Sequence, residues 1–415
     1  MTSLAAPPRL IGSDVEVPCA DGVARRYVNL DHAASTPVLA EVWEAVSAFV
    51  PWYSSVHRGT GAKSRISTEA YEGARASIAR FVGAEHGTTV IVRNTTEAIN
   101  VLAAALAPGT RVLSTPVEHH ANMLPWRRHD LRVLPFPTSQ DHLLATTREA
   151  LQTRRTDLLA VTGASNVTGE VWPLRELAEL AHEHGAQLFV DAAQLAPHRA
   201  LDMDALGVDH LALSGHKLYA PFGAGALVSR APLAGDPLIQ GGGAIKLVTD
   251  DDVIWADAPE RFEAGSPNVI GAVALAAACD ALDMAQVEAR ELALGARLHA
   301  GLHAIDGLTT YQLWPLHHDR VGVATFNLAG YAHHELAQRL SDEFAIGVRH
   351  GCFCAHPLLT RLLGVPDAEA RRLHAELEAG RDPELPGAVR ASLGIGSTAQ
   401  DVDALLEALI ACQTR

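Results

Sequence analysis

The stretch Leu211-Ala-Leu-Ser-Gly-His-Lys-Leu-Tyr219 carries the first strong indication of the fold. An apolar run ends in small and polar residues, and Lys217 follows where a strand should give way to a loop. A lysine amine beside His216 and the Ser214 hydroxyl is suited to hold an aldehyde as an imine. Most lysines at strand ends, however, are simply exposed to solvent. This stretch alone does not decide between the two interpretations.

A second apolar strand, Gln187-Leu-Phe-Val-Asp-Ala-Ala-Gln194, ends in a carboxylate, Asp191, with an amide three residues later. An enzyme that uses pyridoxal phosphate needs a reactive lysine and also a carboxylate. The carboxylate keeps the pyridine nitrogen of the cofactor protonated, so that the ring can withdraw electrons from the substrate. The pair Asp191 and Lys217 therefore favours a catalytic lysine over a surface lysine.

A strand-end aspartate followed by a strand-end lysine resembles the class V aminotransferases, a family of fold-type I pyridoxal phosphate enzymes. Within that family the sequence is most similar to group II cysteine desulfurases and selenocysteine lyases, over roughly residues 27 to 408. The resemblance implies an α/β fold with a mainly parallel seven-stranded sheet flanked by helices, and a smaller α+β C-terminal domain. We expect residues 27–285 to form the large cofactor-binding domain. Residues 1–26 and 286–415 should form the small domain.

Composition limits the possible partners and location. The chain has 415 residues, is 48% hydrophobic and carries a net charge of -15, so it can bury a large core. This charge argues against nucleic acid or an anionic membrane as a partner. Five scattered cysteines do not form a secreted disulfide framework. Met1–Pro8 lacks the features of a signal peptide, and no apolar run is long enough to span a bilayer. We therefore expect a cytoplasmic protein.

Strands and helices alternate along residues 90–229, which predicts parallel βαβ units with right-handed crossovers. In such a sheet the C-terminal ends of the strands meet at one edge, where open α/β sheets bind ligands. The candidate residues all follow strands, so this argument for one shared site does not depend on the resemblance. The expected strands are 90–93, 111–114, 158–162, 187–191 and 224–229, and the expected helices are 38–49, 68–81 and 171–184.

The segment Asn94-Thr-Thr-Glu-Ala-Ile-Asn100 turns a short strand into a helix. Hydroxyl groups at a helix N-terminus form a ready anion site. The alternative is a capping box, with Thr95 or Thr96 as the cap and no ligand. The resemblance favours the phosphate of the cofactor as the ligand, with Thr96 as the side chain that matches best.

The resemblance also assigns roles to residues elsewhere in the chain. His119 is placed over the cofactor ring, and Asn166 contacts the cofactor and the substrate, although an Asn in a Gly-containing turn is often only a turn residue. His57 and Ala34 lie near the substrate. Ser266 reaches across a twofold homodimer to the neighbouring phosphate. The complete set expected to bind the cofactor is Thr95, Thr96, His119, Asn166, Asp191, Gln194, Ser214, His216, Lys217 and Ser266.

The C-terminal region contains Gly347-Val-Arg-His-Gly-Cys-Phe-Cys-Ala-His-Pro357, in which Cys354 matches the desulfurase nucleophile. Neighbouring cations can favour the reactive thiolate. Arg390 is predicted to hold the substrate carboxylate as a bidentate fork, with Arg349 in support. The alternative is that Cys354 is buried and chemically inert. The cysteines and histidines of this loop lack a usual zinc spacing, and we expect no metal.

This loop departs from group II desulfurases, which usually carry histidines where this chain has Cys352 and Phe353. The G-C-F-C form is closer to molybdenum cofactor sulfurases. The segment 360–386 is also longer than expected and contains a charged helical run. A second thiol two residues from Cys354 can resolve a persulfide, pass sulfur onward or take no part.

The resemblance implies a pyridoxal phosphate enzyme that converts L-cysteine to L-alanine, with the sulfur passing to Cys354 as a persulfide. Lys217 would then act as the base at the α-carbon, and a sulfur-acceptor protein is a possible partner. Three alternatives stay open. The first is a β-lyase, epimerase or aminotransferase-like enzyme on another amino acid, in which Cys354 is idle. The second is a molybdenum cofactor sulfurase, and the third is a non-catalytic sulfur-relay protein.

Overall fold

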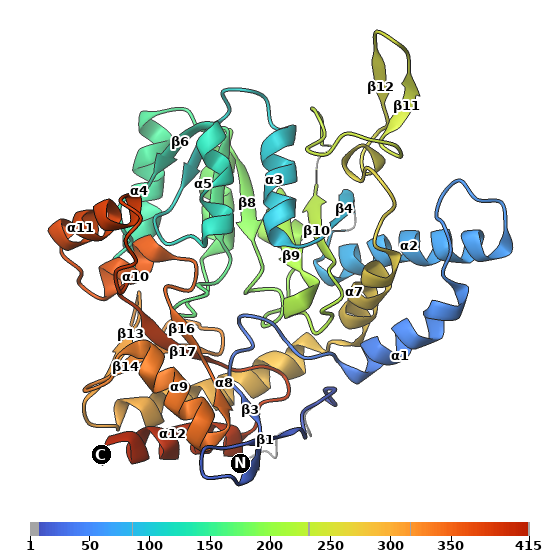
Figure 1. Cartoon of the computed structure of the whole chain (residues 1–415). Coiled ribbons are helices and arrows are strands. Elements are labelled where there is room, and N and C mark those ends of the chain that lie inside the picture. The colour runs from blue at the N-terminus through green and yellow to red at the C-terminus, as the bar shows by residue number, and fades with distance from the viewer. Residues whose placement is uncertain (1–7, 85, 231–232, 316, 414–415) are drawn as a thin grey trace.

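The computed structural model describes residues 8–84, 86–230, 233–315 and 317–413, and its largest element is a seven-stranded sheet (Figure 1). The strands lie in the order β4-β10-β9-β8-β7-β5-β6. Their bounds are β4 (Thr88–Val92), β5 (Arg111–Ser114), β6 (Asp130–Val133), β7 (Leu158–Thr162), β8 (Gln187–Asp191), β9 (His210–Ser214) and β10 (Gly225–Ser229).

Parallel pairing dominates this sheet. The strands β6, β5, β7, β8 and β9 pair in parallel, whereas β10 is antiparallel to both β9 and β4. The predicted α/β fold with a mainly parallel seven-stranded sheet is therefore confirmed. Since β4 runs in the same direction as β9, the C-terminal ends of β4, β5, β7, β8 and β9 all lie at one edge of the sheet.

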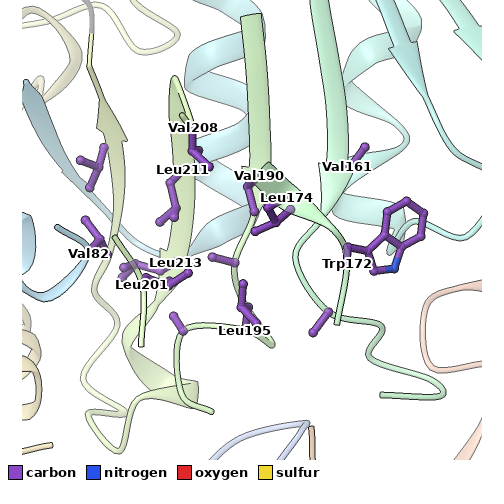
Figure 2. Packing of buried hydrophobic residues seen from close by; sticks show 14 of the residues in the cluster. Val82, Val161, Trp172, Leu174, Val190, Leu195, Leu201, Val208, Leu211 and Leu213 are labelled. Carbon is purple, nitrogen blue, oxygen red and sulfur yellow. The ribbon is translucent and has the colours of Figure 1, made fainter. Parts of the chain in front are cut away.

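Successive residues of the central strands pack into two different cores, because side chains alternate between the faces of a sheet. Leu211 and Leu213 of β9 belong to the larger core, and Ala212 between them belongs to the core on the opposite face. Figure 2 shows Leu211, Leu213 and Val190 in the larger core, together with Leu174 of helix α5 (Leu174–Glu183). Burial on both faces explains why these strands are continuously apolar.

Helices cover both faces of the sheet. Buried residues of α2, α4, α5 and α7 belong to the larger core, and those of α3 belong to the core on the other face. The bounds are α1 (Ala40–Phe49), α2 (Ala62–Phe81), α3 (Thr95–Ala105), α4 (Gln140–Thr153), α5 (Leu174–Glu183), α6 (Met203–Leu206) and α7 (Val269–Ala281). Short 3₁₀ turns are η1 (Val50–Trp52), η2 (His120–Asn122), η3 (Pro125–Arg128), η4 (Gly215–Lys217) and η5 (Glu260–Phe262).

A second, four-stranded sheet in the order β13-β14-β17-β16 has its own core with α8, α9 and α12. The N-terminal strand β3 joins this part of the molecule by pairing in parallel with β15. The bounds are β3 (Val28–Asn29), α8 (Met284–His303), β13 (Leu308–Tyr311), β14 (Val323–Leu328), α9 (His333–Phe344), β15 (Ile346–Gly347), β16 (Arg349–Gly351), α10 (His356–Leu362), α11 (Asp367–Glu378), β17 (Ala388–Ser392) and α12 (Ala399–Gln413). The exact division at residue 285 stays a prediction.

Two features differ from what the sequence suggested. Helix α2 begins at Ala62, six residues before the expected start at residue 68, and its N-cap is Gly61, with no capping side chain. A hairpin of β11 (Ile245–Val248) and β12 (Val253–Trp255) was not predicted, and it projects from the body (Figure 1). A small N-terminal hairpin pairs β1 (Glu16–Pro18) with β2 (Ala24–Arg26).

Within the described residues, no single helix has the length and apolar character needed to cross a membrane. The helices α7 and α8 meet that condition only when they are taken together, and they are bent by 75° at their junction. The sequence predicts that Met1–Pro8 is not a signal peptide. Residues 1–7 of this segment lie outside the part of the chain that the structure describes.

Candidate active site

A cavity of about 580 Å³ lies at the edge where the strand ends meet. It collects side chains from five strand ends and from the β16–α10 loop of the second sheet. All predicted site residues except His57 and Ser266 line it. They are Ala34, Thr95, Thr96, His119, Asn166, Asp191, Gln194, Ser214, His216, Lys217, Arg349, Cys354 and Arg390.

Lys217 and Asp191 stand at the ends of the neighbouring strands β9 and β8. Burial lowers the pKa of the Lys217 amine to about 8, although the Asp191 charge acts in the opposite direction. Burial also raises the pKa of Asp191, whose Oδ1 accepts a hydrogen bond from the Ala193 amide at 3.0 Å. An amine whose pKa lies near neutrality is available as a nucleophile and as a base.

The N-terminus of α3 faces the cavity beside Lys217. Its cap is Asn94, whose side chain accepts a hydrogen bond from the Glu97 amide at 3.0 Å. The alternative that made Thr95 or Thr96 the cap is therefore wrong. Thr95 instead bonds through its amide and its hydroxyl to the Ser214 hydroxyl, both at 2.8 Å, and Thr96 lines the cavity. The assignment of these threonines to a phosphate stays a prediction.

His119 lines the cavity as a neutral imidazole. Burial, followed by the charge of Lys217, lowers the pKa of His119 to about 3. Its Nδ1 accepts a hydrogen bond from the Ala121 amide at 3.1 Å, so the proton belongs on Nε2. The preceding residue, Glu118, is a buried polar residue that sequence reasoning missed.

Glu118 is fully buried behind His119. Its carboxyl accepts hydrogen bonds from the Thr115 hydroxyl and the Asn122 amide, both at 2.6 Å. Burial raises the pKa of Glu118 to about 8, with a further contribution from the Asp191 charge. A protonated carboxylic acid at this position is neutral and fixes the turn that carries His119.

Two arginines converge on one carboxylate that sequence reasoning also missed. Asp31 accepts from Arg390 at 3.2 Å through Oδ1 and from Arg349 at 3.0 Å through Oδ2. Arg390 is buried, donates to the Asn166 carbonyl at 2.9 Å, and has its pKa lowered to about 10 by that burial. Its Nε finds no hydrogen-bond partner among the described residues. A ligand carboxylate therefore has a buried donor available beside Asp31.

Cys354 is exposed and lies on a loop whose backbone is held in place. Phe353 and Cys354 both have φ near +54°, a left-handed conformation that costs non-glycine residues about 1 kcal/mol or more. The Phe353 carbonyl accepts from the Asn166 amide at 2.7 Å, and the Cys354 carbonyl accepts from the His120 amide at 2.7 Å. The Phe353 ring is buried, and the Arg390 guanidinium lies 5.0 Å from its centre.

His57 and Ser266 lie apart from this cavity. Both line a separate cavity of about 590 Å³, and the His57 Nε2 is 2.8 Å from Glu72. The predicted role of Ser266 requires another copy of the chain, whereas His57 was expected near the substrate and does not line the cavity that holds Lys217. Both roles stay predictions. Among the described residues, no group of three or more His, Cys, Asp and Glu side chains is arranged to hold a metal ion.

The residues present fit pyridoxal phosphate. The cavity offers a lysine and a carboxylate at adjacent strand ends and a hydroxyl-bearing helix N-terminus. One buried polar atom that lines it, the Gln194 Oε1, has no hydrogen-bond partner in the described part of the chain, while the Nε2 of the same amide donates to the Ala33 carbonyl at 2.6 Å. A bound ligand would satisfy that atom.

The sheet topology and this set of side chains define a fold-type I pyridoxal phosphate enzyme. The family model described as Aminotransferase class-V matches residues 28–405, and the chain belongs to this family. It is 39% identical over 354 residues to a cysteine desulfurase of Dickeya dadantii, which covers 81% of this chain and 85% of the relative.

Two solved structures extend the comparison. The apo structure of a cysteine desulfurase from Thermococcus onnurineus NA1 superposes with a TM-score of 0.81 and 28% sequence identity. The matched region covers 98% of this chain and 99% of the chain of that structure. The structure of the cysteine desulfurase CsdA from Escherichia coli superposes with a TM-score of 0.76 and 32% sequence identity. The matched region covers 93% of this chain and 94% of the chain of that structure.

Proposed function

We propose that the protein is a cysteine desulfurase, which converts L-cysteine to L-alanine and takes the sulfur onto Cys354 as a persulfide. The observation that carries the proposal is that an exposed thiol, on a loop fixed by Asn166 and His120, lines the same cavity as Lys217 and Asp191. The similarity to cysteine desulfurases over most of the chain supports it.

Pyridoxal phosphate, when bound, supplies an electrophilic aldehyde and a ring that withdraws electrons from the α-carbon of an amino acid. Lys217 would hold it covalently, and Asp191 would pair with the ring nitrogen. Thr95, Thr96 and the N-terminus of α3 would bind its phosphate.

Arg390 is the residue that would bind the carboxylate of L-cysteine. Its guanidinium is buried and already positioned by the Asn166 carbonyl, so little side-chain entropy is lost on binding. Asp31 holds Arg349 next to it. The shared carboxylate keeps both arginines at the cavity until the substrate carboxylate arrives.

Lys217 would move the proton at the α-carbon, since burial lowers its pKa to about 8 and its amine can be neutral near physiological pH. In the sulfur step the Cys354 thiolate attacks the sulfur of the substrate. The carbon–sulfur bond breaks, its electron pair stays with the carbon, and protonation of that carbon gives alanine. The new sulfur–sulfur bond leaves Cys354 as a persulfide.

The assembly and surroundings of the enzyme form part of the same proposal. His57 and Ser266 share one cavity away from Lys217, which supports a homodimer in which Ser266 contributes to the neighbouring site. The exposed Cys354 supports transfer to a sulfur-acceptor protein. All five cysteines are free thiols, which supports a reducing, cytoplasmic location.

The test is the carbon product formed when purified, cofactor-loaded protein meets L-cysteine. The wild type should release alanine, Cys354→Ser should not, and Cys279→Ala, which removes a buried thiol of α7 outside the site, should behave as the wild type. Release of pyruvate and ammonia that survives Cys354→Ser would replace the desulfurase with a β-lyase.

A further inference from the structure

A second thiol lies in the same cavity as Cys354 and is not used by the proposed reaction. Cys352 is half-buried, lines the cavity with Lys217, and stands two residues before the nucleophile. Both cysteines line the cavity, and the Phe353 ring between them is buried. The Cys352 carbonyl accepts a hydrogen bond from the Ala355 amide at 3.0 Å, so the two cysteines occupy one tight turn. The second thiol is thus held directly against the residue that carries the persulfide.

His356 is the polar partner of this thiol. A hydrogen bond between the two side chains lowers the pKa of Cys352 and raises the pKa of His356. Both directions are those of a thiolate–imidazolium pair, and thiolates are the nucleophilic form of cysteine. Cys352 is therefore prepared for attack on sulfur.

His356 is itself held in place by His120. The two rings stack with centres 5.0 Å apart and planes within 10°, and the His356 Nδ1 lies 3.2 Å from the His120 Nε2. His120 is also the residue whose amide binds the Cys354 carbonyl at 2.7 Å. His120 therefore positions both the loop of Cys354 and the side chain of His356, the partner of Cys352. His356 is exposed, so this pair can be reached from solvent.

We infer that Cys352 is a second sulfur carrier, which takes the terminal sulfur from the Cys354 persulfide and returns Cys354 to its thiolate form. The Cys352 thiolate attacks the outer sulfur of the persulfide. A new sulfur–sulfur bond forms on Cys352, the bond to the Cys354 sulfur breaks, and its electron pair leaves with Cys354. The step starts from a persulfide on Cys354 and a thiolate on Cys352, and it ends with a persulfide on Cys352 and a thiolate on Cys354. No oxidant or reductant is therefore consumed.

The geometry permits this exchange within the loop. A persulfide places its outer sulfur about 2 Å beyond the cysteine sulfur, and Cys352 and Cys354 line the same cavity from one turn, which the bond from the Ala355 amide to the Cys352 carbonyl closes. The consequence is quantitative. Each chain can complete two turnovers before any acceptor arrives, because the first sulfur is moved off the nucleophile.

The inference rests on the proposed function, and the experiment separates the two. Cofactor-loaded enzyme is mixed with a small excess of L-cysteine and no other thiol, then quenched and alkylated. Alanine is counted per chain, and sulfane sulfur is located by intact mass and peptide mapping. The wild type and the Cys279→Ala control should release two alanines and carry sulfur on both Cys352 and Cys354. Cys352→Ser should stop after one alanine, with one sulfur on Cys354.

His356→Gln tests the positioning role of the histidine. Both thiols remain, so two sulfurs should still accumulate, but the second alanine should form about tenfold more slowly, as expected for the loss of one charge-assisted hydrogen bond. One alanine per wild-type chain, with unmodified Cys352, would overturn the inference and leave the proposed function intact. A Cys352–Cys354 disulfide with released sulfide would also overturn it. No alanine from the wild type would instead contradict the proposed function.

Discussion

The raised pKa of the buried Glu118 carboxyl can be tested quantitatively through the pH dependence of stability. Its carboxyl is enclosed, accepts hydrogen bonds from Thr115 and Asn122, and has its pKa raised to about 8 from an ordinary value of 4.5. A group with a raised pKa in the folded state stabilises the protein below the unfolded value, and that stability is lost as the pH rises toward the folded value. Glu118→Gln keeps the size and polarity of the side chain and removes the titration.

The expected size follows from linkage. Between pH 4.5 and 8 the folded wild type holds a proton at Glu118 that the unfolded chain has lost, so the free energy of unfolding falls by about 1.4 kcal/mol per pH unit relative to Glu118→Gln. From pH 5.5 to 7.5 the difference changes by about 2.7 kcal/mol. A chain of 415 residues has an unfolding entropy of about 0.9 kcal/mol/K. The melting temperature of the wild type should therefore fall by about 3 °C relative to the variant.

The assay is thermal unfolding of both holoenzymes across this pH range. The control is Cys279→Ala, because burial raises the pKa of that thiol and keeps it neutral throughout the range. Its difference from the wild type should not depend on pH. A Glu118→Gln difference that is equally flat would refute the reasoning, because it would mean that the carboxyl ionises in the folded protein as it does in water.

Three further predictions concern other residues. Arg75→Met should destabilise the protein by about 3 to 5 kcal/mol, because it removes the cation that pairs with the buried Glu263 carboxylate at 2.5 and 2.6 Å and leaves this charge with neutral donors, the Tyr71 hydroxyl and the Ile91 amide. Thermal unfolding measures this loss, and adding Glu263→Gln should recover most of it. Arg390→Lys should raise the KM for L-cysteine by about 10- to 100-fold through loss of a charge-assisted hydrogen bond, whereas Arg372→Lys on the surface of α11 should leave it unchanged. Lys217→Ala should lower the rate of alanine formation by about 10²- to 10⁴-fold with an unchanged circular dichroism spectrum, and retention of the wild-type rate would remove Lys217 from the reaction.

The parts of the site that follow strands could be predicted from the sequence. Lys217, Asp191, His119 and Asn166 each come after an apolar strand, and parallel strands bring such positions to one edge of a sheet. The same argument predicted the sheet itself, because β7, β8 and β9 are buried on both faces and read as apolar runs.

Contacts between distant segments could not be predicted in this way. Asp31 and Arg390 are separated by 359 residues. No local pattern in the sequence marks Asp31 as the shared partner of Arg349 and Arg390. Glu118 reads as an ordinary polar residue before two histidines, and only the closed packing around it reveals its burial. The pairing of His356 with His120 likewise joins segments that lie 236 residues apart in the chain. Ser266 illustrates a different limit, because its predicted role needs another copy of the chain.

The most direct test of the central claim compares two quantities in one quenched sample, the alanine released and the sulfane sulfur held by the protein. The account predicts one sulfur on the protein for each alanine formed from L-cysteine, with none on Cys354→Ser. Pyruvate with free sulfide, formed while every thiol of the protein stays unmodified, would contradict it.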